Sequence, residues 1–185
     1  LSFGDLQSTA AWMVSQGVAV INMSLAWLWD GPGDGTSPFL ASALTTVDQA
    51  VSGGAIWVNS AGNAAMANWF GGYSDVDSDG WMEFAANVEE NGVALTAGTW
   101  FRAQARWEDS WSNASRDFDL YLFDSNQNVV ASSGNRQLGG AGQVPYETLS
   151  YTPAASGTYF LSISHFSGTV PQWLQLNTFT GQDLS

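Results

Sequence analysis

The sequence has no cysteine and no lysine, and it contains a single histidine. Without cysteine the chain can form neither disulfides nor a thiolate zinc site, although many secreted bacterial proteins also lack cysteine and the compartment stays open. Without lysine, only four arginines oppose 17 acidic residues, and the net charge is -13. Because such a charge repels phosphate backbones and anionic lipids, we expect neither a nucleic-acid partner nor a membrane partner.

The sequence also lacks any apolar run of membrane-spanning length, and its first residues do not show the pattern of a signal peptide. It opens on Leu1 rather than on methionine, so we expect an internal piece of a longer protein. Hydrophobic residues make up 45% of the chain, which is enough for a real core in one large domain or two small ones.

Residues 1–70 have the pattern of an α/β fragment. Helical spacing follows a candidate N-cap at Asp5 and ends at Gly17, and an apolar run over 18–25 then predicts a strand. Ser37-Pro38 predicts the start of a second helix that ends at Gly53-Gly54, before a buried strand over 55–59. The order helix, strand, helix, strand predicts parallel strands covered by helices, as part of a larger sheet.

Period-two patterns replace helical ones in the second half of the chain. We expect an antiparallel β-sandwich over 81–185, joined to the first domain by an acidic linker over 71–80. The apolar faces of three strands alternate with polar residues, as in Phe101, Ala103, Ala105 and Trp107; Phe118, Leu120 and Leu122; and Tyr159, Leu161 and Ile163.

The stretch 55–63 changes within three residues from β-forming side chains to small and polar ones, and it ends on Gly62 and Asn63. Strand ends in parallel sheets are where such sheets bind ligands. Small residues leave space beside the backbone, and the Asn63 amide can aim two N–H donors into that space. The alternative is a polar turn residue at an ordinary strand end.

The segments 20–25, 47–51 and 57–63 together resemble the substrate-binding strand, following helix and oxyanion-hole strand of the subtilisin-like serine peptidases. The resemblance implies that Asn63 stabilises the oxyanion of acyl transfer, chemistry that needs no cofactor. It also implies that a polypeptide substrate binds along two short segments, for which ordinary buried strand ends are the alternative: Ser24, Leu25 and Ala26; and Ser60, Ala61 and Gly62. The family usually has glycine where Ala26 stands.

The segments 117–123, 130–133 and 151–159 resemble the pre-peptidase C-terminal type of β-sandwich. That module accompanies many secreted bacterial peptidases, so the resemblance implies an extracellular protein in which the sandwich is inserted after the oxyanion strand.

No motif in the sequence matches the aspartate, histidine or serine of the subtilisin-like triad. Gly35-Thr36-Ser37 mimics the nucleophile tripeptide but precedes the oxyanion strand, and Ser37 is better explained as a helix cap. His165 lies at the end of a sandwich strand, where a packing role is expected. We therefore expect the isolated chain to be inert as a peptidase and its open sheet edges to favour self-association.

Asp75, Asp77 and Asp79 alternate before Gly80, as in the first half of a calcium-binding loop. A complete EF-hand loop would have glutamate at Ala86, and Glu83 comes too early to replace it. The stretch is interpreted either as a calcium site or as a solvated acidic linker. Asp117 and Asp119 are expected instead to meet Arg102 or Arg106 across strands.

The ten tryptophans raise a second interpretation of function, a non-catalytic carbohydrate- or protein-adhesion module on a degenerate peptidase scaffold. Several coplanar, exposed tryptophans would favour it, whereas burial in the sandwich core would not. Those in or near the β region are Trp69, Trp81, Trp100, Trp107, Trp111 and Trp173.

Overall fold

The computed structural model describes residues 3–25, 31–32, 36–37, 39, 42–62 and 64–185. The chain divides into two compact units, Leu1–Asn63 and Ala64–Ser185. Each unit has its own hydrophobic cluster, and each is described separately. In the described part of the chain, no helix is both long and apolar enough to cross a membrane.

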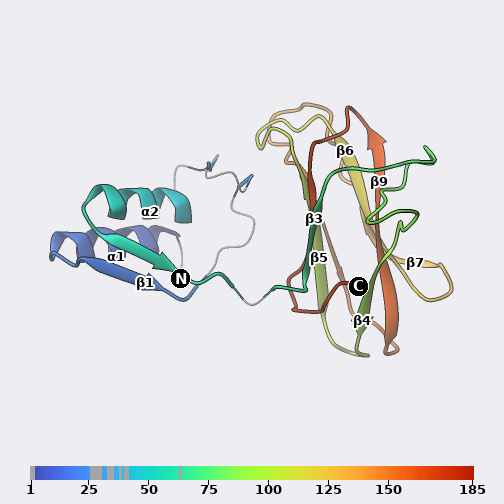
Figure 1. Cartoon of the computed structure of the whole chain (residues 1–185), viewed down its shortest axis with the longest axis horizontal. Helices are drawn as coiled ribbons and strands as arrows, with labels where there is room; N and C mark the ends of the chain where they lie inside the picture. The colour runs from blue at the N-terminus through green and yellow to red at the C-terminus, as the bar shows by residue number, and fades with distance from the viewer. Residues whose placement is uncertain (1–2, 26–30, 33–35, 38, 40–41, 63) are drawn as a thin grey trace. The chain divides into compact units, whose positions relative to one another are not determined.

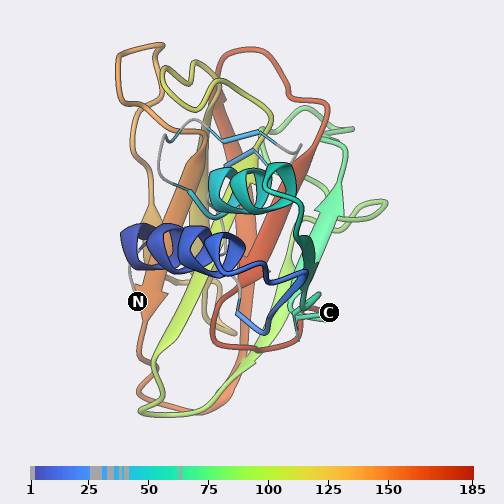
Figure 2. The ribbon, with the colours of Figure 1, turned by 90° about the vertical axis from the view of Figure 1, so that its left-hand side faces the viewer.

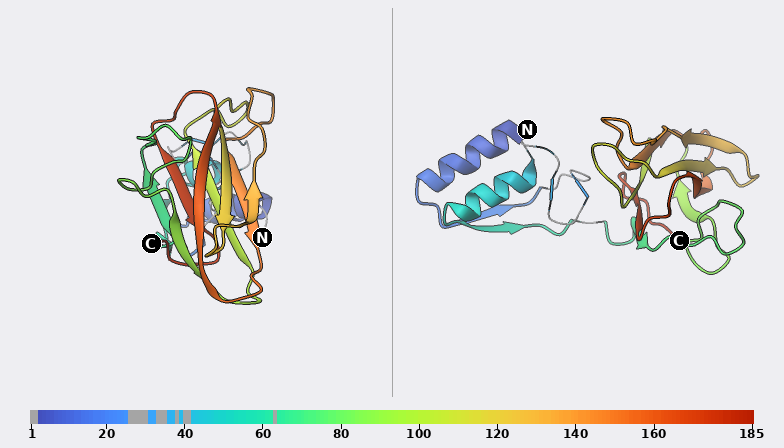
Figure 3. Two further views of the ribbon diagram at one scale, coloured as in Figure 1. Left: turned by 90° about the vertical axis from the view of Figure 1, so that its right-hand side faces the viewer. Right: turned by 90° about the horizontal axis from the view of Figure 1, so that it is seen from above.

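The first unit contains two helices and two parallel strands. In chain order these are α1 (Phe3–Ser15), β1 (Val20–Met23), α2 (Ala43–Ser52) and β2 (Ile56–Asn59). β1 and β2 pair in parallel, with Val20 opposite Ile56 and Met23 opposite Asn59. The two helices lie side by side on one face of this pair (Figure 3, right). The predicted parallel strands with covering helices are therefore present.

The ends of α2 follow local capping chemistry. Its N-cap is Ser42, whose Oγ accepts a hydrogen bond from the Thr45 backbone N–H at 3.1 Å, while the Thr45 hydroxyl accepts one from the Ser42 N–H at 3.0 Å. The cap predicted at Ser37 is wrong, since α2 begins at Ala43 with Ser42 as its N-cap, and the Ser37 hydroxyl accepts from the Phe39 N–H. The predicted stop is confirmed, because Gly53 is the C-cap and Gly54 has φ +94°.

α1 begins two residues earlier than its predicted cap, so Asp5 lies in the first turn rather than at the N-cap. There its carboxylate faces the positive end of the helix dipole, a stabilising position for an acidic residue. Gly17 has φ +75°, as expected of the residue that ends this helix.

The face of β1 and β2 away from the helices is exposed. Val20, Ile56 and Val58 are 54%, 63% and 47% exposed, whereas Ile21, Ala50 and Ala55 on the helix side are buried. The prediction of a buried strand at 55–59 is therefore wrong for this structure. The physical reason is that two strands with helices on a single face can bury only one set of alternating side chains.

The second unit is an antiparallel β-sandwich of two four-stranded sheets (Figures 1 and 3, left). One sheet has the order β3-β10-β5-β8 and the other β4-β9-β6-β7. The strands are β3 (Asn68–Gly71), β4 (Asn91–Leu95), β5 (Phe101–Trp107), β6 (Asp117–Phe123), β7 (Val129–Ser133), β8 (Tyr146–Tyr151), β9 (Gly157–Ser167) and β10 (Leu174–Thr178). Figure 2 shows the same ribbon turned by 90°.

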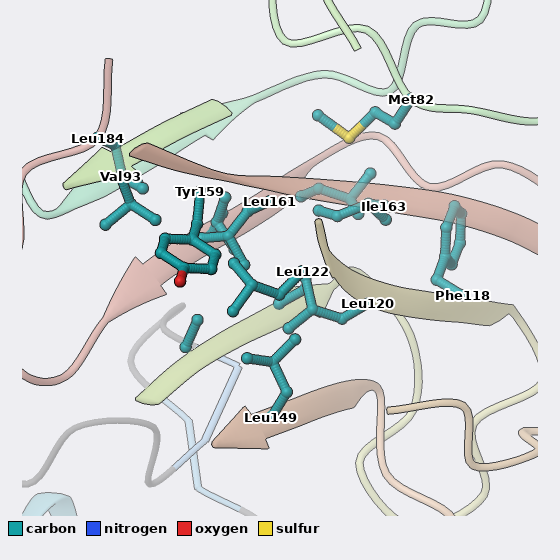
Figure 4. Packing of buried hydrophobic residues seen from close by; sticks show 14 of the residues in the cluster. Met82, Val93, Phe118, Leu120, Leu122, Leu149, Tyr159, Leu161, Ile163 and Leu184 are labelled. Carbon is teal, nitrogen blue, oxygen red and sulfur yellow. The ribbon is translucent and has the colours of Figure 1, made fainter. Parts of the chain in front are cut away.

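The core of the sandwich is made by the alternating residues that the sequence predicts. Phe118, Leu120 and Leu122 of β6 are 0% exposed, and they pack against Leu161 and Ile163 of β9 (Figure 4). The apolar residues of β5 and Tyr159 are buried as well, and Trp107 is 0% exposed. The antiparallel sandwich is thus confirmed, and it follows from period-two patterning.

The sandwich unit begins earlier than the expected start at residue 81. β3 pairs antiparallel with β10, so residues expected in the first domain belong to the sandwich. The stretch 71–80, expected to link the domains, lies inside this unit, where His165 donates its backbone N–H to the Gly80 carbonyl at 2.8 Å. The Met82 backbone N–H likewise donates to the Ile163 carbonyl, so residues 80–82 lie alongside β9.

Candidate functional site

The carboxyl ends of β1 and β2 bring together two of the segments expected to bind substrate. Ser60 donates its N–H to the Met23 carbonyl at 3.0 Å, and the Asn59 side chain donates to the carbonyls of Ser60 at 2.9 Å and Leu25 at 3.5 Å. Because parallel strands end at the same edge of a sheet, this proximity follows from the topology.

The predicted substrate-binding residues that the structure describes are all exposed: Ser24, Leu25, Ser60, Ala61 and Gly62. Gly62 has φ +85°, a left-handed conformation that glycine adopts without strain. Ala26 and the candidate oxyanion residue Asn63 lie outside the described residues.

His165 is placed for packing. Its ring stacks on Phe118 with centroids 4.8 Å apart and meets the edge of Tyr73 at 5.6 Å. Its Nε2 atom is buried without a hydrogen-bond partner. A triad base shares hydrogen bonds with a serine hydroxyl and a carboxylate, and the Nε2 atom of His165 has no such bond.

The acidic stretch 75–80 forms a tight loop. Carboxylate oxygens of Asp75, Asp77 and Asp79 all lie within 4.8 Å of one another. The Asp75 carboxylate accepts hydrogen bonds from the backbone N–H groups of Asp79 and Gly80, each at 3.2 Å, and from the Tyr73 hydroxyl at 3.2 Å. Three converging carboxylates offer the hard oxygen ligands that calcium prefers.

Two further carboxylates lie around this loop. Glu83 is 6% exposed and accepts a hydrogen bond from the Ser74 hydroxyl at 2.8 Å, while its N–H donates to the Ser74 carbonyl and closes the loop. Burial raises the pKa of Glu89, and the charges of Asp79 and Asp77 raise it further. Glu89 lies beyond the span of the calcium-loop pattern, so no local signal groups it with these residues.

Burial and the neighbouring Asp75 also raise the pKa of Tyr73 well above its ordinary value. Its phenol therefore stays protonated and serves as a hydrogen-bond donor to Asp75.

The expected pairing of Asp117 and Asp119 with Arg102 or Arg106 is wrong, because β6 and β5 belong to different sheets. Asp119 accepts a hydrogen bond from the Tyr121 hydroxyl at 3.1 Å. Asp117 is 1% exposed and neither of its oxygens has a hydrogen-bond partner. Burial raises the pKa of Asp117, and the charge of the neighbouring Asp119 raises it further.

A second buried carboxylate is fully satisfied. Glu147 of β8 is 0% exposed, and it accepts hydrogen bonds at 2.8 Å each from the Asn135 backbone N–H, the Asn135 side chain and the Gln137 side chain. The Ser133 hydroxyl is a fourth donor. This carboxylate ties the connection after β7 to β8 and so has a structural role.

The tryptophans of the β region do not form one exposed plane. Trp107 and Trp111 are buried, and Trp81 meets Tyr121 edge to face. Trp100 is 52% exposed. Trp173 stacks on the exposed ring of Phe70, with centroids 5.8 Å apart and planes inclined by 28°.

One family match falls within the sandwich. Residues 92–165 match the model of a family described as the bacterial pre-peptidase C-terminal domain. No curated protein matches the sequence.

Two solved structures show weak similarity. Truncated FlgD from Helicobacter pylori aligns at 13% identity with a TM-score of 0.32, covering 60% of this chain and 76% of that one. The CBM22-1–GH10 modules of xylanase 10B from Clostridium thermocellum align at 12% identity with a TM-score of 0.29. That alignment covers 67% of this chain and 25% of the xylanase chain.

Residues 92–165 run from β4 into β9 and include strands of both sheets. The β-sandwich of this chain is therefore similar to the pre-peptidase C-terminal domains, which are associated with bacterial peptidases.

Proposed function

We propose that this chain is a segment of a secreted subtilisin-like serine endopeptidase. Leu1–Asn63 would supply the oxyanion asparagine and the substrate-binding strand ends, and the sandwich would be its non-catalytic accessory domain. The observation that carries the proposal is the match of residues 92–165 to the pre-peptidase C-terminal domain. Domains of that type are typical of secreted bacterial proteins, which supports the extracellular location.

The geometry of the strand ends supports the peptidase part. β1 and β2 are parallel neighbours with α2 between them in sequence. At one edge the Ser60 N–H donates to the Met23 carbonyl, and the Asn59 amide donates to the carbonyls of Leu25 and Ser60. An extended polypeptide substrate could pair there through backbone hydrogen bonds. Asn63 follows this edge in sequence and would donate to the developing oxyanion.

The exposed apolar face of the first unit supports a larger catalytic domain. Val20, Ile56 and Val58 form one uncovered stripe on the β1–β2 pair. A parallel sheet in an α/β protein normally has both faces covered, so a further layer would bury this stripe. Open edges of the same pair would also recruit a second chain, and a monomeric sedimentation profile of the purified chain would refute such self-association.

The proposal is tested in the parent protein by Asn63→Ala. We expect kcat to fall by roughly 10²–10³-fold with little change in KM, the size known for the oxyanion asparagine of this peptidase family. Asn126→Ala is the control, because Asn126 is an exposed amide residue in the turn between β6 and β7 of the sandwich, and this variant should keep wild-type activity. Equal activity of Asn63→Ala and the wild type would contradict the assignment.

The flanking gene sequence separates this function from its alternative. An aspartate and a histidine in family motifs before residue 1, and a Gly-Thr-Ser motif after residue 185, would support the peptidase. A degenerate triad would support a non-catalytic binding module, for which the sandwich similarity alone is sufficient.

We further propose that Asp75, Asp77 and Asp79 bind calcium, with Glu83 and Glu89 adding negative charge around the ion. The converging carboxylates support this site, and calcium would relieve their mutual repulsion. Its role would be structural, since the loop closes through Ser74 and Glu83 within the sandwich.

A further inference from the structure

A cavity of about 270 Å³ opens between β3 and β4, the end strands of the two sheets of the sandwich. Trp69 of β3 and Asn91 of β4 line it. The rest of its wall comes from the segments just before each of these strands and from residues 184–185. All of these residues belong to the unit Ala64–Ser185, so the cavity is a feature of the sandwich itself.

The wall of the cavity is fixed by contacts within the sandwich. The Leu184 N–H donates to the Met66 carbonyl at 2.8 Å, which joins two parts of the wall that are far apart in sequence. The Phe84 N–H donates to the Val88 carbonyl at 2.7 Å and closes a tight turn. The Trp69 ring meets the Phe84 ring edge to face, with centroids 5.1 Å apart. A ligand therefore meets a surface that is already formed, which lowers the entropic cost of binding.

The cavity is lined mainly by apolar side chains. Met66 and Val88 are 62% and 43% exposed, whereas Trp69 and Phe84 are half-buried. Asn91 is 4% exposed and its Oδ1 has no hydrogen-bond partner, so the wall also contains an unsatisfied acceptor. Because pockets for drug-sized molecules measure about 300–1,000 Å³, this cavity has room for little more than one apolar side chain.

The chain around the cavity carries negative charge and no positive charge. Glu89 and Glu90 lie directly before the lining residue Asn91, and the exposed Asp183 lies directly before Leu184. These three carboxylates are not among the aspartates proposed to bind calcium. The charge therefore favours a cationic ligand. Residues 64–100 contain no arginine, lysine or histidine, and their acidic residues are Asp75, Asp77, Asp79, Glu83, Glu89 and Glu90.

The sheet edge beside the cavity favours a polypeptide ligand. Among the strands that the structure describes, β3 pairs with β10 only, so its other edge is open to an extended chain. Side chains of an added strand point alternately to its two faces. One apolar side chain can therefore enter the cavity while the residues before and after it point away from the cavity.

We propose that this cavity binds a basic polypeptide segment. One apolar side chain of the segment, such as phenylalanine, packs between Met66, Trp69 and Val88, and flanking lysine or arginine side chains pair with Glu89 and Glu90. Exposed ion pairs contribute little each, so the apolar side chain supplies most of the affinity, while the charges select the partner and speed its association. The site lies within the sandwich and does not depend on the proposed peptidase function.

The test is binding of the purified chain to a fluorescent peptide that has one phenylalanine between two pairs of lysines, measured by anisotropy. Low salt keeps exposed charges unscreened, and a chelator keeps calcium from changing the charge of the loop. We expect replacement of the phenylalanine by alanine to weaken binding at least about tenfold, as loss of a buried apolar side chain does. Replacement of the lysines by glutamates should abolish binding.

Variants of the protein locate the site. Met66→Ala should weaken binding at least about fivefold, and Glu89→Gln roughly two- to fivefold. Leu138→Ala is the matched control for Met66, because Leu138 is 63% exposed and lies outside the cavity wall. Asp48→Asn also removes one charge, from an exposed residue of α2 in the first unit. Both controls should bind the peptide as the wild type does.

Three results would overturn the proposal. One is no binding of the lysine–phenylalanine peptide by a folded wild-type chain. Another is equal affinity for the alanine peptide or for the glutamate peptide, since either would remove the requirement for an apolar side chain flanked by basic ones. The third is equal weakening by Met66→Ala and Leu138→Ala. Since Met66 is exposed, Met66→Ala should retain the wild-type melting temperature to within a few degrees, which separates lost binding from lost folding.

Discussion

Replacing Glu147 with glutamine tests whether one buried carboxylate fixes the connection between β7 and β8, which joins the two sheets. Each Glu147 oxygen accepts two hydrogen bonds: Asn135 N–H and Gln137 Nε2 bind one oxygen, and Asn135 Nδ2 and the Ser133 hydroxyl bind the other. Glutamine keeps the shape but turns one oxygen into an NH₂ group that faces two donors. Because the side chain is 0% exposed, water cannot replace the lost acceptor.

The expected loss follows from these bonds. A hydrogen bond to a charged group contributes about 1.5–3 kcal/mol, so losing two would cost roughly 3–6 kcal/mol. Rotation of the Ser133 hydroxyl into an accepting position recovers part of this, so we expect the free energy of unfolding to fall by about 3 kcal/mol. For a domain of this size that corresponds to roughly 10 °C in melting temperature.

Urea unfolding at pH 7, followed by circular dichroism, measures this change. Glu90→Gln is the control, since Glu90 is only partly buried and its replacement should change stability by less than about 0.5 kcal/mol. If Glu147→Gln also changed the unfolding free energy by less than about 0.5 kcal/mol, the carboxylate would not anchor the connection between β7 and β8.

Three further predictions follow from single residues. Asp117 has a raised pKa in the folded state, so its protonated form favours folding. This contribution to the free energy of unfolding is present below about pH 3.9 and is lost as pH rises through the folded pKa. In urea titrations, Asp117→Asn should make the free energy of unfolding fall less with rising pH and should raise it at pH 7. Leu120→Ala removes a 0% exposed core side chain and should cost roughly 3 kcal/mol by the same assay, whereas equal stability would contradict the packing seen in Figure 4. Calcium at about 100 times its Kd should stabilise the wild type by roughly 2.7 kcal/mol, and Asp77→Asn should abolish most of this shift in melting temperature; identical shifts would exclude the loop as the site.

The core of the sandwich was predictable from local pattern. The alternation in β5, β6 and β9 predicts which side chains face inward, because a strand's side chains point to opposite faces in turn. The stop of α2 at Gly53 was equally predictable, since glycine is the common residue just past a helix end.

Features that depend on distant residues were not predictable. β3 has only four residues and pairs with β10, about a hundred residues later in the chain, so no local signal assigned it to the sandwich. The start of α2 was misplaced because Ser42 and Thr45 cap each other, a pair outside the usual capping-box pattern with glutamate or glutamine. The exposure of Ile56 depends on how many layers surround its strand.

Contacts between side chains also differ in whether they could be predicted from local sequence. Asp75, Asp77 and Asp79 are close in sequence, and their convergence was predictable from their spacing. By contrast, Phe70, Arg106 and Trp173 meet only because β3, β5 and β10 are neighbours in one sheet, so their contacts follow from topology and not from local sequence.

The proposed role of this chain is tested directly by assaying the purified chain for cleavage of unfolded casein. We propose that this chain supplies an accessory sandwich and substrate-binding strand ends but contains no catalytic triad. We therefore expect no cleavage above buffer, with or without a serine-directed reagent. Robust turnover that the reagent abolishes would contradict it, because the nucleophile would then have to lie within this chain.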